Sequence, residues 1–98
     1  MRVLFVAEAA AEAIAARRCY DRQAPGLGTE FVRALDAAIA AITRSPHAFT
    51  PVDECCRRAL LRRFPFSVVY RADETAILVI AVFHHRRQPR AWVERPVE

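Results

Sequence analysis

The chain has 98 residues, the size of one domain with a single hydrophobic core, and we expect one domain over residues 1–98. Hydrophobic residues make up 54% and charged residues 27%, which excludes the compositions typical of disordered, collagen-like and coiled-coil chains. The formal net charge is +4, and all 15 basic residues are arginines. Residues 57–90 hold eight arginines and two acids, a net +6, so an anionic partner, either nucleic acid or an acidic protein segment, is expected there.

The cysteine pattern and the hydropathy pattern indicate a cytoplasmic protein. Cys19, Cys55 and Cys56 are odd in number and include an adjacent pair, which suits neither a disulfide framework nor a CxxC metal or redox site. The longest apolar run, residues 76–83, has eight residues, whereas a membrane helix needs about 20. Glu8 and Glu12 interrupt any signal-peptide core. We therefore expect no membrane segment and no export.

The first half of the chain predicts a short strand and a helical hairpin. Residues 3–6 are apolar and partly β-branched, which is typical of a buried strand. Residues 8–23 are rich in alanine and predict a helix, which residues 24–26 end through a proline and a glycine. Thr29 is the expected N-cap of a second helix that runs to Ser45-Pro46. The expected packing stripes are Ala9, Ala13, Ala16 and Tyr20 in the first helix, and Phe31, Leu35, Ala38, Ile39 and Ile42 in the second.

The second half changes to the period of two that is typical of strands. Residues 57–64 alternate, Pro65 marks a boundary, and residues 66–71 alternate again before a polar turn at 72–75. Residues 77–83 are apolar on both faces, so this strand should be central. The sequence therefore predicts an α+β domain, with order β-α-α-β-β-β and the helix pair on one face of a four-stranded, mainly antiparallel sheet. A short helical or extended tail follows.

The tail after residue 83 carries a dense group of cations. It contains His84, Arg86, Arg87, Arg90 and Trp92. One interpretation is a cationic ledge with a titratable histidine at the edge of the sheet. The alternative is a solvated run of charge with Trp92 folded back into the core, and the charge pattern alone does not choose between them.

Familiar enzyme and metal motifs are absent. The sequence has no GxSxG, GxGxxG or P-loop pattern. A zinc site from His84, His85, Cys55 and Cys56 is disfavoured because adjacent strand residues point to opposite faces, so we expect no metal and no cofactor.

Two possibilities remain, which are metal-free cleavage of RNA and no chemistry at all. Cleavage needs a base, an acid and cations near the phosphate. The candidates for these roles are Arg62, Arg63, Tyr70, His84, Arg86 and Arg87. Tyr70 also fits an ordinary half-buried position in the sheet.

An ordered set of short motifs extends over nearly the whole chain. The set comprises Tyr20, Pro25-Gly26-Leu27-Gly28, Phe31, Ser45-Pro46, Leu61-Arg62-Arg63-Phe64-Pro65-Phe66, Val69-Tyr70, Ala81-Val82-Phe83-His84, Arg86-Arg87, Pro89, Trp92 and Arg95. In this order the motifs resemble the RelE/ParE toxin superfamily, and they are nearer its ParE branch. The resemblance implies the same strand–helix–helix–meander layout and the toxin half of a bacterial type II toxin–antitoxin pair.

The branches of this superfamily differ in their targets. The ParE resemblance implies a protein that inhibits DNA gyrase by contact, arrests growth and has no catalysis of its own. The RelE alternative implies a metal-independent endonuclease that cuts mRNA in the ribosome. The chain has no tyrosine after Tyr70 and no lysine, which departs from the nuclease pattern, whereas Arg62 and His84 match positions where some nuclease relatives carry active groups.

Both branches imply a complex with a cognate antitoxin, whose acidic or amphipathic C-terminal segment would cover the sheet and the hairpin. An arginine-rich face and a small core would both gain from such a partner. The expected target-binding residues are Arg57, Arg58, Arg62, His84, Arg86, Arg87, Arg90 and Trp92.

Overall fold

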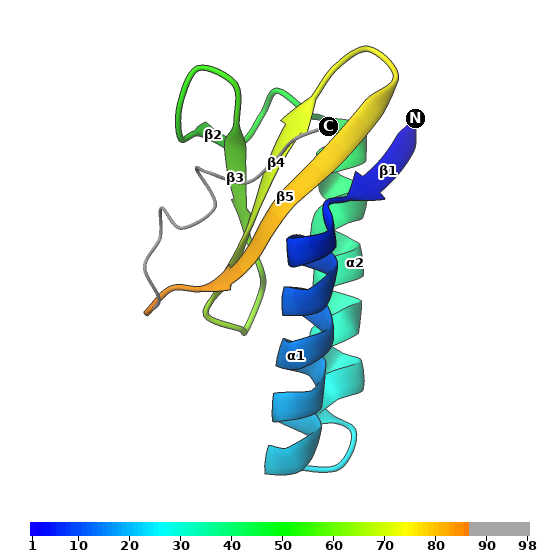
Figure 1. Cartoon of the computed structure of the whole chain (residues 1–98), viewed down its shortest axis with the longest axis vertical. Coiled ribbons are helices and arrows are strands. Elements are labelled where there is room, and N and C mark those ends of the chain that lie inside the picture. Colours follow the sequence, from blue (N-terminus) through cyan, green and yellow to red (C-terminus); the bar gives the residue numbers. More distant parts are fainter. Residues whose placement is uncertain (87–98) are drawn as a thin grey trace.

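The computed structural model describes residues 1–86 and places a helical hairpin against a twisted sheet (Figure 1). The elements are β1 (Arg2–Phe5), α1 (Ala7–Gln23), α2 (Leu27–Arg44), β2 (Thr50–Pro51), β3 (Arg57–Leu60), β4 (Phe66–Ala72) and β5 (Ala76–His84). The strand order is β1-β5-β4-β3-β2, with β1 parallel to β5 and the other neighbours antiparallel. This confirms the predicted α+β class and element order.

Within residues 1–86 the sheet has five strands, one more than the predicted four. The additional strand, β2, has two residues, which pair with Arg58 and Arg57 at the edge of the sheet. A strand of two residues is too short to show the alternation of side chains that identifies a strand in a sequence. Pro51 is tolerated there since it lies at an edge.

The helical hairpin matches its predicted packing stripes. Ala9 and Ala16 of α1 are buried, and so are Phe31, Leu35 and Ile42 of α2.

The predicted N-cap Thr29 was wrong, because α2 begins at Leu27 and Gly26 caps it in the left-handed region at φ 84°. A glycine adopts this conformation without the Cβ clash that penalises other residues, so the connection can be very short.

Two strands depart from their predictions. β1 is an edge strand of the described part of the chain, where β5 is its one neighbour, and Leu4 is 41% and Phe5 36% exposed, so the prediction of a buried strand was wrong. β3 ends at Leu60, four residues before the predicted end. The chain then turns sharply, with Arg63 at φ 68° and the amide of Leu61 donating to the carbonyl of Phe66.

Apolar side chains are buried on both faces of the sheet. On the helix side the rings of Tyr20, Phe31, Phe64 and Phe66 pack together. On the other face lies a second buried cluster, made of Cys56, Val69, Ile80, Ala81 and Phe83. β5 contributes to both clusters and has a strand on each side, which confirms its predicted interior position.

A carboxylate also ties α1 to the sheet. Glu12 Oε1 accepts a hydrogen bond of 2.9 Å from the backbone amide of Val82 in β5. A bond between a charged acceptor and a backbone amide is stronger than a neutral one, so it helps to fix the helix over the strand. Within residues 1–86, neither helix is long and apolar enough to cross a membrane.

Acidic pH is expected to weaken the turn between β4 and β5. Asp73 Oδ1 accepts hydrogen bonds from the amides of Thr75 (2.8 Å) and Ala76 (2.9 Å) and from the Thr75 hydroxyl (3.1 Å). These bonds hold the pKa of Asp73 below its ordinary value of 3.8. Because the folded-state pKa is the lower one, the stabilisation is complete above about pH 4 and is lost as the pH falls through the folded value.

Thermal unfolding between about pH 6 and pH 2 measures this effect. The melting temperature of the unchanged chain should fall more steeply at low pH than that of Asp73→Asn, whose amide does not titrate but can still accept hydrogen bonds. Equal slopes for the two proteins would contradict the role of Asp73.

Candidate functional site

The candidate site residues separate into two groups at opposite ends of β4. Arg57 lies opposite Tyr70, whereas His84 lies opposite Phe66. Tyr70 and Phe66 are four positions apart on one strand, a separation of about 13 Å at the usual rise. The charge count suggested one shared cationic surface. The structure instead separates Arg57 from the group around His84.

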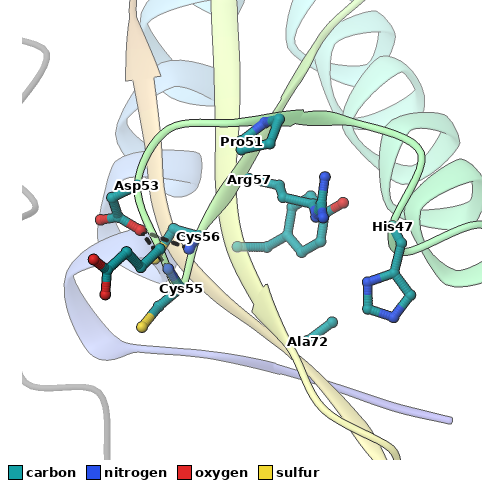
Figure 2. Close-up of a pocket in the computed structure, with 9 residues that line it drawn as sticks. His47, Pro51, Asp53, Cys55, Cys56, Arg57 and Ala72 are labelled. Carbon is teal, nitrogen blue, oxygen red and sulfur yellow. Dashed lines mark hydrogen bonds between the residues drawn. The ribbon is translucent and has the colours of Figure 1, made fainter.

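The first group lines a hollow of about 220 Å³ beside the segment that leads into β2 (Figure 2). The Arg57 guanidinium donates a 2.7 Å hydrogen bond to the carbonyl of Phe49. Tyr70 is fully buried, and its hydroxyl donates to the carbonyl of Pro46 at 2.6 Å. Burial raises the pKa of Tyr70. Tyr70 thus lies deeper in the sheet than the half-buried position that the sequence suggested.

The far wall of this hollow holds the two adjacent cysteines. Asp53 Oδ1 accepts hydrogen bonds from the amides of Cys55 (2.8 Å) and Cys56 (2.7 Å). Burial first, and then the charge of Asp53, raise the pKa of Cys56 to about 11. A thiol that stays protonated at neutral pH is a poor nucleophile. Within residues 1–86, no three His, Cys, Asp or Glu side chains are grouped as a metal ion would require.

The hollow also contains a residue that the sequence analysis missed. His47 faces it from the side opposite the cysteines (Figure 2). The loop between α2 and β2 places His47 at the hollow that Arg57 also lines, and no spacing pattern in the sequence indicated this.

The second group lies where the loop between β3 and β4 meets the end of β5. The His84 ring packs edge-on against Phe66 with centroids 5.2 Å apart. The amide of Arg86 donates to His84 Nδ1 at 3.0 Å, so in the neutral ring the proton sits on Nε2. The amide of His85 donates to the carbonyl of Pro65 at 2.8 Å. This bond joins the end of β5 to the loop that carries Arg62 and Arg63.

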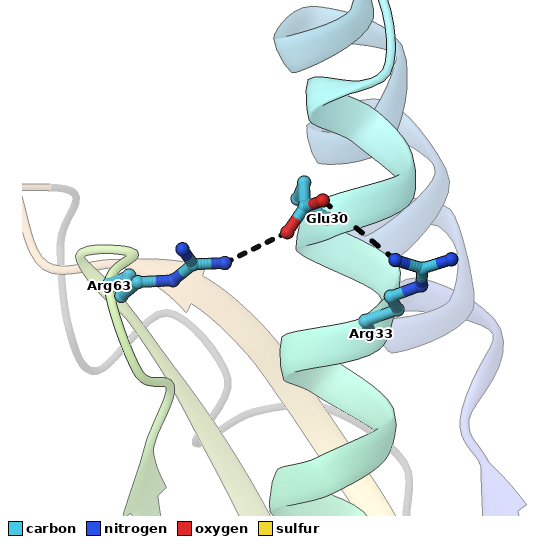
Figure 3. A network of polar contacts seen from close by, with 3 residues as sticks. All are labelled: Glu30, Arg33 and Arg63. Atoms are coloured by element: carbon cyan, nitrogen blue, oxygen red, sulfur yellow. Dashed lines mark hydrogen bonds and ion pairs between the residues drawn. The ribbon is translucent and has the colours of Figure 1, made fainter.

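Arg63 already has an acidic partner. Its guanidinium lies 2.8 Å from Glu30 of α2, and the other carboxylate oxygen of Glu30 lies 3.9 Å from Arg33 (Figure 3). The sequence analysis missed Glu30, because 33 positions separate it from Arg63. Because a guanidinium has five N–H donors and the Arg63 side chain is 73% exposed, Arg63 can contact a further anionic partner beside Glu30.

The remaining arginines differ in the face they present. Arg58 follows Arg57 in β3 and points to the opposite face, since neighbouring strand residues alternate. Arg58, Arg62 and Arg86 are all exposed. The predictions for Arg87, Arg90 and Trp92, and for the tail that carries them, lie outside the described residues.

Comparisons with known proteins agree with this fold and order of elements. Residues 3–89 match the family described as the ParE toxin of the type II toxin-antitoxin system, parDE. Over 57 residues the chain is 37% identical to toxin ParE2 of two Mycobacterium tuberculosis strains, which is 58% of this chain and 54% of each relative. The matched stretch therefore spans about half the length of these curated relatives.

A solved structure shares the fold as well. The chromosomal ParDE system from P. aeruginosa superposes with a TM-score of 0.73 at 18% identity, covering 86% of this chain and 95% of that chain. At this identity the match concerns the fold alone. Because the family match extends over most of the chain, the protein belongs to the ParE family of type II toxin–antitoxin toxins.

Proposed function

We propose that this chain binds DNA gyrase in the cytoplasm, stabilises the cleaved-DNA state of that enzyme and thereby stops replication, until a cognate antitoxin neutralises it. The observation that carries this proposal is the ParE family match over residues 3–89. The chain acts as a binding protein in this proposal, so it needs no catalytic centre of its own.

Exposed arginines supply the contact with the target. Arg62 and Arg86 lie at the same end of the sheet and are exposed, as is Arg58. Their guanidinium groups can bind a carboxylate or a phosphate in two places at once, which suits both a protein surface and cleaved DNA. His84 lies next to Arg86, whose backbone amide donates to His84 Nδ1.

Gyrase supercoiling, measured together with trapping of cleaved DNA, tests the proposal. The unchanged chain should inhibit supercoiling and accumulate cleaved DNA, and its cognate antitoxin should reverse both effects. The double variant Arg62→Glu/Arg86→Glu should be at least about tenfold weaker, because it reverses two contact charges. Arg18→Glu/Arg22→Glu on α1 is the control, since it makes the same change in net charge at two exposed residues.

Two outcomes would count against the proposal. A folded chain that neither inhibits supercoiling nor traps cleaved DNA would reject gyrase as the target. Equal weakening by both double variants would mean that overall charge, rather than this end of the sheet, determines inhibition.

Cleavage of mRNA is the second candidate function. It is favoured by the position of His84 next to Arg86 and beside the loop that carries Arg62. The same preparation should be added to a translating extract, and transcripts should be examined for cuts. Cleavage that His84→Ala abolishes, with supercoiling unaffected, would favour this candidate over gyrase inhibition.

A further inference from the structure

The first strand, β1, leaves one long side of the described sheet open (Figure 1). The amides of Arg2 and Val6 donate to backbone carbonyls on the β5 side, at 3.1 and 3.0 Å. Successive residues of a strand direct their backbone groups to opposite sides, so Val3 and Phe5 direct theirs away from β5. Within residues 1–86 no further strand lies on that side.

The two outer strands of this sheet differ in how they are protected against pairing with another chain. β2 has two residues, and one of them is Pro51, which has no N–H group to donate. β1 has four residues without a proline, and its register with β5 is regular. β1 is thus the edge that can accept another strand.

Apolar side chains of this edge are exposed as well. The exposed fraction is 57% for Met1, 41% for Leu4 and 36% for Phe5. Leu4 and Phe5 border a hollow of about 390 Å³, and Leu78 of β5 lines it too. A strand that pairs with β1 would remove part of this apolar surface from water, which favours association.

The backbone of β1 is complementary to a second copy of itself in antiparallel orientation. When Leu4 faces Leu4 of the second copy, Val3 lies opposite Phe5 of that copy. These are the residues whose backbone groups point outward, so each such pair can exchange both of its N–H···O bonds. The facing leucines form the intervening pair, in which side chains lie closest together.

The charges at the two ends of the strand are complementary in the same register. Arg2 lies opposite Val6 of the second copy, and Glu8 follows two residues later in the first turn of α1. Arg2 and Glu8 are both exposed, and the ion pairs within residues 1–86 include neither of them. A two-fold axis repeats the contact between arginine and glutamate on its other side.

From this self-complementarity we propose that the β1 strands of two chains pair antiparallel about a two-fold axis, which joins the two sheets into one. The interface is small, because a strand of four residues is about 13 Å long. The dimer should therefore dissociate with a constant of about 10–100 µM. This inference concerns the isolated chain and does not depend on the proposed function.

Sedimentation equilibrium of the full chain tests the proposal over about 5–500 µM, a range that brackets this constant. The unchanged chain should pass from monomer to dimer. Leu4→Glu should weaken association at least about tenfold, because two carboxylates then meet at the axis. Arg2→Glu and Glu8→Arg should each weaken it about five- to tenfold, since each creates two contacts between like charges.

An equimolar mixture of Arg2→Glu and Glu8→Arg is the most specific test. In a dimer with one chain of each kind, both end contacts again join an acid to an arginine. The mixture should therefore associate within about twofold of the unchanged chain, although each variant alone associates weakly. A mixture that associates as weakly as its two components would overturn the proposal.

Arg18→Glu and Asp36→Arg are the matched controls, because they reverse charges at exposed positions further along the helices. They should leave association within about twofold of the unchanged chain. Circular dichroism melting shows which variants are folded, and the mixture decides the question even if Leu4→Glu is unfolded. An unchanged chain that stays monomeric throughout the range, or a dimer that the β1 variants do not weaken, would overturn the proposal.

Discussion

Phe31→Ala is expected to lower the free energy of unfolding of the chain by about 3–5 kcal/mol. Phe31 is fully buried, and its ring lies 5.5 Å from that of Tyr20, 5.4 Å from that of Phe64 and 5.0 Å from that of Phe66. The variant loses apolar burial and leaves a cavity among rings that cannot fully close it. A domain of this size has a total stability of only about 5–15 kcal/mol, so much of the margin disappears.

Urea unfolding followed by circular dichroism measures this loss. Phe5→Ala is the matched control, because Phe5 lies on the edge strand β1 and is 36% exposed. Its loss should stay below about 1.5 kcal/mol, since its side chain is only partly removed from water. An equal loss for the two variants would show that the aromatic cluster does not hold the hairpin on the sheet.

Gly28→Ala is expected to destabilise the chain by about 2 kcal/mol and to lower its melting temperature by about 8–16 °C. A Cβ at this position would lie 2.5 Å from the backbone oxygen of Arg17 and 2.6 Å from the carboxylate of Asp21. The amide of Gly28 also donates to Asp21 Oδ1 at 2.8 Å. Alanine improves helix propensity by about 1 kcal/mol, which offsets only part of the cost of moving the two helices apart.

Two further variants identify the cause of this effect. In Asp21→Ala/Gly28→Ala the carboxylate is gone but the backbone oxygen of Arg17 remains, so the double variant should not recover stability. Gly26→Ala meets no atom within 4 Å and should lose only the left-handed backbone strain, about 1–2 kcal/mol. A melting temperature of Gly28→Ala within about 2 °C of the unchanged chain would contradict the close helix contact.

Periodicity predicted the elements that bury a continuous face. The apolar spacing in α2 and the two apolar faces of β5 are properties of each segment alone, so the sequence was sufficient for them. The exposure of β1 could not be predicted in this way, because a four-residue apolar run has the same pattern at the edge of a sheet as in its interior. The early end of β3 depends on Arg63 adopting a left-handed conformation that its residue type does not favour.

Counting charges located the cationic region but not its arrangement. Arg57 and Arg58 are neighbours in sequence, yet strand alternation sends them to opposite faces of the sheet. The partner of Arg63 is Glu30, which comes from a helix 33 positions earlier. Both facts depend on how the hairpin sits on the sheet, and a pattern within one segment does not contain that information.

The pairing of β1 with β5 joins residues 2–5 to residues 76–79. During synthesis, the first strand therefore cannot pair with β5, its neighbour within residues 1–86, until most of the chain has been made. A polypeptide that stops before residue 76 has neither this neighbour nor the strand that contributes to both buried clusters. Prematurely terminated copies should thus be unable to fold, so the domain can form only after the ribosome has passed residue 84.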